Sequence, residues 1–98
     1  MNDIRLRNMT SLYLICGKKI LLLYRIGSRV IKNSYTGTAG GHFESPELND
    51  PKSCVLRELF EETGLTEKNI SDMSLRYITL RRKENEIRQN YFYFANTD

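Results

Sequence analysis

The chain has 98 residues, of which 40% are hydrophobic and 28% are charged, and its formal net charge at pH 7 is +3. This length suits one small domain, and the hydrophobic and aromatic content excludes a disordered chain. The two cysteines belong to no CxxC motif or Cys/His cluster, so we interpret them as reduced, buried thiols. The polar N-terminus shows no signal peptide, and no apolar stretch is long enough to span a membrane. We therefore expect a cytoplasmic protein that does not contact membranes.

Short apolar runs bounded by turn residues predict β-strands on both sides of a central helix. The first two runs flank Gly17 and Lys18 and are typical of a β-hairpin. The last two flank a short polar turn. The expected strands are residues 11–16, 20–24, 75–82 and 87–95.

The last strand carries four consecutive aromatic residues, in which Tyr91 and Tyr93 alternate with Phe92 and Phe94. Alternation places the tyrosines on one face of a sheet and the phenylalanines on the other. A sheet covered on both faces would bury both pairs, which is the interpretation we favour. The alternative is that one pair stacks on a nucleobase.

The segment between Asp50 and Gly64 carries the signals of a short helix. Asp50 suits the N-cap, and Pro51 suits the first helical position because its fixed φ and missing N–H do no harm there. Gly64 favours termination, since glycine tolerates left-handed φ. At about 100° per residue, one arc of this helix is apolar and the next is acidic. The apolar arc consists of Val55, Leu56, Leu59 and Phe60.

The acidic arc holds Glu58, Glu61 and Glu62, and no lysine or arginine follows these residues at the i+4 position. Like charges at these spacings repel each other, and the helix dipole disfavours anions near the C-terminus. We therefore predict that a cation compensates the cluster, and Mg²⁺ fits because it binds a few carboxylate oxygens together with substrate phosphates. Gly40 and Gly41 precede the helix, and their backbone is suited to approach a metal or an anion. A tight turn is the alternative for this glycine pair.

Opposite charges are segregated along the chain. Basic residues dominate residues 1–40 and 73–98, whereas acidic residues dominate residues 41–72. A metal site that attracts a polyanion would have this pattern, and so would ordinary solvated faces. Arg25 and Arg29 are candidates for phosphate contacts, with plain exposure to solvent as the equal alternative. Stable binding to nucleic acid is not expected, because the basic residues are scattered and form no known reader motif.

The nine residues from Arg57 to Leu65, RELFEETGL, match the second half of the Nudix box, REUxEExGU, at every fixed position. The preceding GGHFE, which begins at Gly40, resembles the glycine-rich opening of the same box. The chain thus resembles the MutT-like Nudix hydrolases. The family pattern has a Glu eight residues before the Arg, where this chain has Asn49, and the loop is two residues longer. Glu44 or Glu47 is expected to replace that carboxylate.

The resemblance implies an α/β fold, namely a Nudix-type α/β/α sandwich with a mixed sheet. Residues 1–98 would form a single Nudix domain that is truncated at the C-terminus relative to the family. It also implies hydrolysis of a nucleoside diphosphate linked to another group, with Mg²⁺ or Mn²⁺ as cofactor. A (d)NTP pyrophosphohydrolase of the nucleotide-pool-cleaning type is the version we favour.

The same resemblance implies roles for individual residues. Glu58, Glu61 and Glu62 would bind the metal together with the Gly40 carbonyl. Glu58 would also be the general base, and Arg57 would orient a carboxylate by a charge-assisted hydrogen bond. The candidate substrate-binding residues are Arg25, Arg29 and Gly41.

Two other interpretations remain open. The chain could be a non-catalytic Nudix-like module that binds a nucleotide for regulation, although such a module has no need for three clustered carboxylates. It could also be an incomplete domain that pairs with a second copy, because an aromatic strand at an open sheet edge invites association. A homodimer is therefore one expected state.

Overall fold

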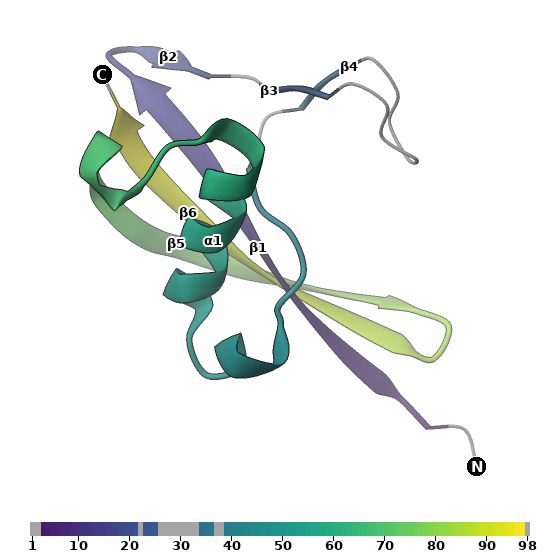
Figure 1. Cartoon of the computed structure of the whole chain (residues 1–98). Coiled ribbons are helices and arrows are strands. Elements are labelled where there is room, and N and C mark those ends of the chain that lie inside the picture. The colour runs from purple at the N-terminus through teal and green to yellow at the C-terminus, as the bar shows by residue number, and fades with distance from the viewer. Residues whose placement is uncertain (1–2, 22, 26–33, 37–38, 98) are drawn as a thin grey trace.

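The computed structural model describes residues 3–21, 23–25, 34–36 and 39–97 (Figure 1). Within these ranges four strands precede the helix α1, and two long strands follow it. Their bounds are β1 Arg5–Cys16, β2 Lys19–Ile20, β3 Leu23–Arg25, β4 Ser34–Thr36, β5 Ile70–Lys83 and β6 Glu86–Thr97. The helices are α1 Pro51–Thr63 and the short 3-10 turns η1 Ser45–Glu47 and η2 Glu67–Asn69.

The main sheet has the strand order β2-β1-β6-β5 and is mixed. Strands β1 and β6 run parallel from Arg5 opposite Glu86 to Ile15 opposite Asn96, and the other pairs are antiparallel. The predicted α/β class with a mixed sheet is confirmed. The predicted hairpin of residues 75–82 and 87–95 is also confirmed, with longer strands.

The predicted hairpin of residues 11–16 and 20–24 is confirmed in its turn and in its first strand, which lies within β1, but its second strand is shorter than predicted. Ile15 pairs with Ile20 and Cys16 with Lys19, so the second strand of this hairpin has two residues. Residues 23–25 pair instead with residues 34–36 in a separate two-stranded sheet.

The helix α1 begins and ends where its capping residues predict. The Asp50 carboxylate accepts hydrogen bonds from the backbone N–H of Ser53 at 3.2 Å and from its hydroxyl at 2.6 Å. At the other end Gly64 has a φ of +77° and donates its N–H to the Phe60 carbonyl. None of the helices in the described ranges is long and apolar enough to cross a membrane.

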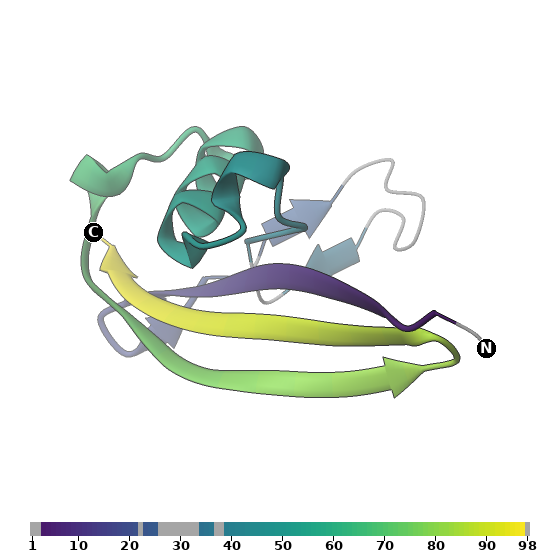
Figure 2. The ribbon, with the colours of Figure 1, turned by 90° about the horizontal axis from the view of Figure 1, so that it is seen from below.

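The core lies between α1 and one face of the main sheet (Figure 2). Val55 and Leu59 of the helix are fully buried against this face. Of the other two residues of the apolar arc, Leu56 packs against this core, whereas Phe60 is 57% exposed. The sheet residues of the core are Leu12, Leu14, Tyr93 and Ala95, and Ala39 joins them from the loop before α1.

The aromatic residues of β6 divide between the two faces of the sheet. Tyr93 is buried beneath α1, and Tyr91 packs beside it. Phe92 and Phe94 point to the opposite face, where they are half-buried. Within the described ranges no helix lies on that second face (Figure 2), so the expectation of a sheet covered on both faces is not met there.

Candidate functional site

The glycine-rich loop before α1 lies along strand β1 as a short extra edge. Leu12 and Ala39 exchange backbone hydrogen bonds of 2.6 and 2.9 Å, and Thr10 donates its N–H to the Gly41 carbonyl at 2.9 Å. The alternation of these bonds fixes the loop against the sheet. The Gly40–Gly41 backbone is therefore held in place by the core strand.

Gly40 and Gly41 each occupy a position where a Cβ would meet a different neighbour. Gly40 has a φ of +143°, and a Cβ at this position would lie 2.1 Å from the Thr10 carbonyl oxygen. A Cβ at Gly41 would lie 2.7 Å from the carboxyl carbon of Glu58. The Gly40 N–H donates to Oε2 of Glu62 at 3.2 Å. The missing Cβ of Gly40 thus lets the loop lie against β1, and the missing Cβ of Gly41 lets Glu58 approach the loop backbone.

Arg57 is the centre of the polar site. Its Nη1 donates to Oε1 of Glu58 and to Oε2 of Glu61, both at 2.8 Å. Its Nη2 donates to the His42 carbonyl at 3.0 Å. Its Nε and Nη2 donate to the two oxygens of Glu47 at 2.8 and 3.1 Å. These anions raise the pKa of Arg57, with the Glu47 hydrogen bonds as the largest cause, so the guanidinium stays charged.

The structure corrects the expectation that the glutamate cluster has no cation of its own. Arg57 precedes Glu61 by four residues and pairs with Glu58 and Glu61 at once. The expectation considered only cations that follow each glutamate in the sequence. Arg57 precedes Glu61, and i,i+4 pairs also form in this direction.

Glu47 takes the place of the carboxylate that the loop was expected to supply. It forms the paired hydrogen bonds to Arg57, and its side chain is buried. The Glu44 carboxylate lies 3.5 Å from Nε of Arg57 and is 62% exposed. The family pattern also places this Glu six residues after the second glycine, and Glu47 lies six residues after Gly41. The two extra residues therefore lie between Glu47 and Arg57.

Burial and the nearby charges shift the pKa values of the half-buried Glu58 and the buried Glu47 in opposite directions. Burial raises the pKa of Glu58, and the carboxylates of Glu61 and Glu62 add to this effect, while Arg57 opposes it. The pKa of Glu47 is lowered, chiefly by the hydrogen bonds from Arg57. Ionised Glu58 would therefore gain most from an added cation.

The structure brings six of the predicted site residues together, and it does not describe the side chains of the other two. Gly40, Gly41, Arg57, Glu58, Glu61 and Glu62 lie together at the loop and the adjoining face of α1. Arg25 belongs to β3, whose side chains are not described, and Arg29 lies outside the described residues.

The donor atoms near Arg57 are of the kind that a hard divalent cation prefers, namely carboxylate and carbonyl oxygens. In the described part of the chain, no three His, Cys, Asp or Glu side chains are grouped as metal ligands. Glu58 and Glu61 instead direct oxygens to Arg57, and Glu62 directs one to the Gly40 N–H. The residue types fit Mg²⁺, and a bound ion would need these side chains to turn toward it.

The thiol of Cys54 lies beneath the loop and is fully buried. It is 3.3 Å from the Thr10 hydroxyl, and burial raises its pKa to about 11. Both cysteines are free, as predicted, but only Cys54 is buried, because Cys16 at the end of β1 is half-buried. The buried Cys54 is a packing residue, since a reactive thiol needs a lowered pKa and access to solvent.

The fold and sequence were compared with known proteins. Residues 6–98 match the NUDIX domain. The solution structure of the E. coli ORF135 protein has a TM-score of 0.65 and 18% identity, over 94% of this chain and 61% of that one. The NUDIX domain of Shewanella oneidensis NrtR, complexed with ADP ribose, has a TM-score of 0.67 and 18% identity, over 100% and 63%.

A MutT/nudix family protein from Enterococcus faecalis has a TM-score of 0.57 and 24% identity, over 96% of this chain and 37% of that one. The chain thus spans less than two-thirds of the length of each of these structures. No curated protein matches the sequence. The match over residues 6–98 shows that the chain belongs to the Nudix family.

Proposed function

We propose that the chain hydrolyses a pyrophosphate linkage in a nucleoside diphosphate derivative, with Mg²⁺ or Mn²⁺ as cofactor. The observation that carries the proposal is the meeting of two helix glutamates with the glycine pair. Glu62 accepts a hydrogen bond from the Gly40 N–H, and Glu58 lies against Gly41. This arrangement places carboxylates beside a stretch of backbone that has no side chain to block a phosphate.

Glu58, Glu61, Glu62 and the Gly40 carbonyl would hold the metal. When bound, the divalent ion would neutralise the diphosphate and make an attacking water more acidic. Arg57 would hold Glu58 in position through its 2.8 Å hydrogen bond. Glu58 would accept the proton of the water at a carboxylate oxygen, as a general base.

Arg25, Arg29 and Gly41 are the proposed contacts for the substrate. The structure of the NrtR NUDIX domain contains ADP ribose, which has a diphosphate between an adenosine and a ribose. This supports a nucleotide with a diphosphate as the substrate class, and (d)NTPs remain our favoured example. Residues 1–98 would act as a single domain.

A second candidate function is nucleotide binding without hydrolysis. Arg57 occupies oxygens of Glu58 and Glu61, and the described residues contain no ready group of three metal-ligating side chains. A module that binds a nucleotide for regulation would keep this arrangement. Both functions require a bound nucleotide, and only the first one hydrolyses it.

The test is phosphate or pyrophosphate release from a panel of (d)NTPs, ADP-ribose and nucleotide sugars, with Mg²⁺ and with EDTA. Glu62→Gln is the site variant, and Glu67→Gln is the control, because Glu67 is 65% exposed and pairs with the exposed Lys52. The proposal expects metal-dependent release that falls at least about 100-fold in Glu62→Gln only. Tight nucleotide binding without release would favour the second candidate.

A further inference from the structure

His42 follows the glycine pair, and its side chain and backbone contact two different arginines. Nη2 of Arg7 lies 3.3 Å from Nδ1 and 3.0 Å from Nε2 of the His42 ring. Nη2 of Arg57 donates to the His42 carbonyl oxygen at 3.0 Å. Because Arg7 belongs to β1 and Arg57 to α1, this loop residue is held from the sheet and from the helix at once.

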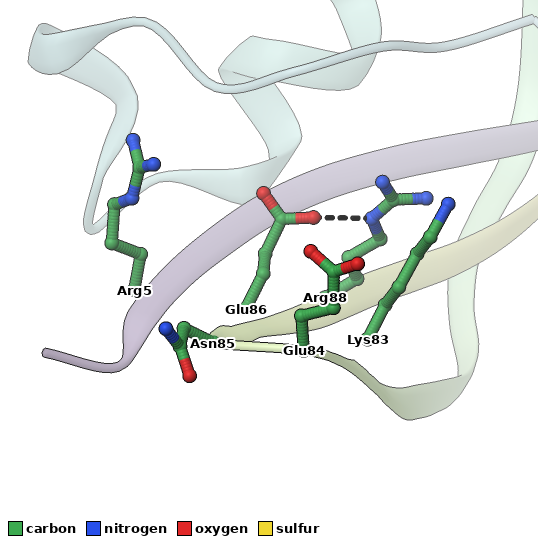
Figure 3. Close-up of a pocket in the computed structure, with 6 residues that line it drawn as sticks. All are labelled: Arg5, Lys83, Glu84, Asn85, Glu86 and Arg88. Atoms are coloured by element: carbon green, nitrogen blue, oxygen red, sulfur yellow. Dashed lines mark hydrogen bonds and ion pairs between the residues drawn. The ribbon is translucent and has the colours of Figure 1, made fainter. Parts of the chain in front are cut away.

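Arg7 is itself fixed by the β5–β6 hairpin. Its Nη1 donates to Oε1 of Glu86 at 3.2 Å, and Nε of Arg88 donates to Oε2 of the same carboxylate at 2.6 Å. Glu86 and Arg88 form this pair beside a cavity of about 340 Å³ at the turn of the hairpin (Figure 3). These hydrogen bonds hold the pKa of Glu86 below its ordinary value, with the bond from Arg88 as the largest cause. The carboxylate therefore stays ionised between the two arginines.

The backbone on both sides of His42 pairs with β1. Thr10 donates its N–H to the Gly41 carbonyl at 2.9 Å, and Phe43 donates its N–H to the Asn8 carbonyl at 3.0 Å. These bonds set the register of the loop against the strand that contains Arg7. A shift of His42 would strain both bonds and displace the glycine backbone beside it.

The contacts form a chain through four elements, namely β6, β1, the loop and α1. The chain joins Arg7 to a residue 79 positions away in β6 and to one 35 positions away in the loop. A network of charged groups fixes geometry better than an isolated ion pair does. At its far end Arg57 also donates to Glu58, so a displaced loop would disturb the acidic face of the helix.

We propose that Arg7 is a positioning residue of the site, which holds the glycine-rich loop through the His42 ring and is itself set by Glu86. The connection from Arg7 to the loop stands on the contacts alone. Its effect on turnover rests on the hydrolase function proposed above. Arg7 would act on the reaction through the loop and not by touching the substrate.

The first measurement is amide hydrogen exchange of the full chain in EDTA, followed by NMR, and it needs no enzymatic activity. Arg7→Gln should raise the exchange rate of the Phe43 amide at least about threefold, because the loop opens more often when His42 is released. The Gly64 amide, which bonds to the Phe60 carbonyl at the end of α1, should keep its rate. Thermal unfolding verifies that the variant is folded.

Three further variants define the contact. Arg5→Gln is the matched control, because Arg5 lies two residues earlier on the same face of β1 and has the same charge. It should leave the Phe43 amide unchanged, whereas Glu86→Gln should raise its exchange. His42→Leu removes the ring and keeps the carbonyl, and Arg7→Gln should have no further effect in that background.

The second measurement is turnover of a (d)NTP that the wild type hydrolyses. Arg7→Gln should lower kcat about 5- to 10-fold and leave KM within about twofold, as expected of a residue that orients the site without binding substrate. Absence of turnover in the wild type would contradict the hydrolase function, and the exchange rates would still decide the role of Arg7.

Four results would overturn the proposal. One is an unchanged Phe43 amide in the folded Arg7→Gln variant. Another is an equal rise in exchange in Arg5→Gln, or at Gly64, which would indicate net charge or a general loss of stability. The third is an undiminished effect of Arg7→Gln in the His42→Leu background. The fourth is a raised KM with kcat unchanged, which would make Arg7 a direct contact of the substrate.

Discussion

Glu47 and Arg57 face each other through two hydrogen bonds of 2.8 and 3.1 Å, formed by Nε and Nη2 of the arginine. Glu47 ends the 3-10 turn η1, and Arg57 lies in the middle of α1. The pair therefore ties the glycine-rich loop to the helix. The same guanidinium also holds Glu58 and Glu61, so the position of the loop and that of the acidic face are coupled.

Removing the charge of Glu47 should disturb this coupling. We expect Glu47→Gln to lower the free energy of unfolding by about 1–3 kcal/mol, because it weakens a charge-assisted hydrogen bond at a buried side chain. Any hydrolase activity should fall about 10- to 100-fold, because Arg57 and Glu58 lose their support. Urea unfolding and turnover measurements give the two values.

Glu44→Gln is the matched control for this prediction. Glu44 is 62% exposed and lies 3.5 Å from Nε of Arg57, so its contribution should be below about 0.5 kcal/mol. Equal effects of the two substitutions would contradict the assignment of Glu47 as the partner that holds Arg57.

The same pair predicts how stability depends on pH. The pKa of Glu47 is lowered in the folded chain, so the unfolded chain binds more protons between this pKa and the ordinary carboxyl value. Stability from Glu47 is thus present above the ordinary value and is lost as pH falls through the lowered one. Between about pH 6 and pH 3, the wild type should lose more stability than Glu47→Gln. This prediction would be contradicted if the urea midpoints of the wild type and of Glu47→Gln fell by the same amount over this pH range.

The capping signals and the acidic face could be predicted because they depend on neighbours in sequence. Asp50, Pro51 and Gly64 bound α1 as expected, and the glycine pair adjoins the glutamates. The length of β1 could not be predicted from its own residues, because its N-terminal half pairs with β6. In this pairing Arg5 lies opposite Glu86, which is more than 80 residues away in the sequence. Local periodicity contains no information on such a parallel partner.

One detail of the site follows from the sequence only when the loop is counted from Gly41. Counted back from Arg57, Glu44 and Glu47 remain alternatives, whereas the count from Gly41 identifies Glu47, which the 3-10 turn η1 places against Arg57. The face of Phe92 and Phe94 follows from alternation, but what covers that face depends on the rest of the fold.

The two glycines of the loop should respond differently to substitution. Gly40→Ala should cost at least about 2 kcal/mol of stability, because its Cβ would meet the Thr10 backbone and its φ is +143°. Gly41→Ala would meet only the end of the Glu58 side chain, which can rotate away. The second variant should therefore fold and lose activity. Thermal unfolding and turnover distinguish them, and a folded, fully active Gly41→Ala would contradict the role given to Glu58.

Divalent metal should stabilise the folded chain if the α1 glutamates bind it. An ion that binds only the folded state at about 100 times its Kd adds about 2.7 kcal/mol. Glu58 should contribute most, because burial raises its pKa and a cation would offset the cost of its buried charge. We expect Mg²⁺ to raise the Tm of the wild type and of Glu67→Gln, whose glutamate is 65% exposed and pairs with Lys52. Glu58→Gln should lose most of this rise, and an undiminished rise in that variant would place the metal elsewhere on the protein.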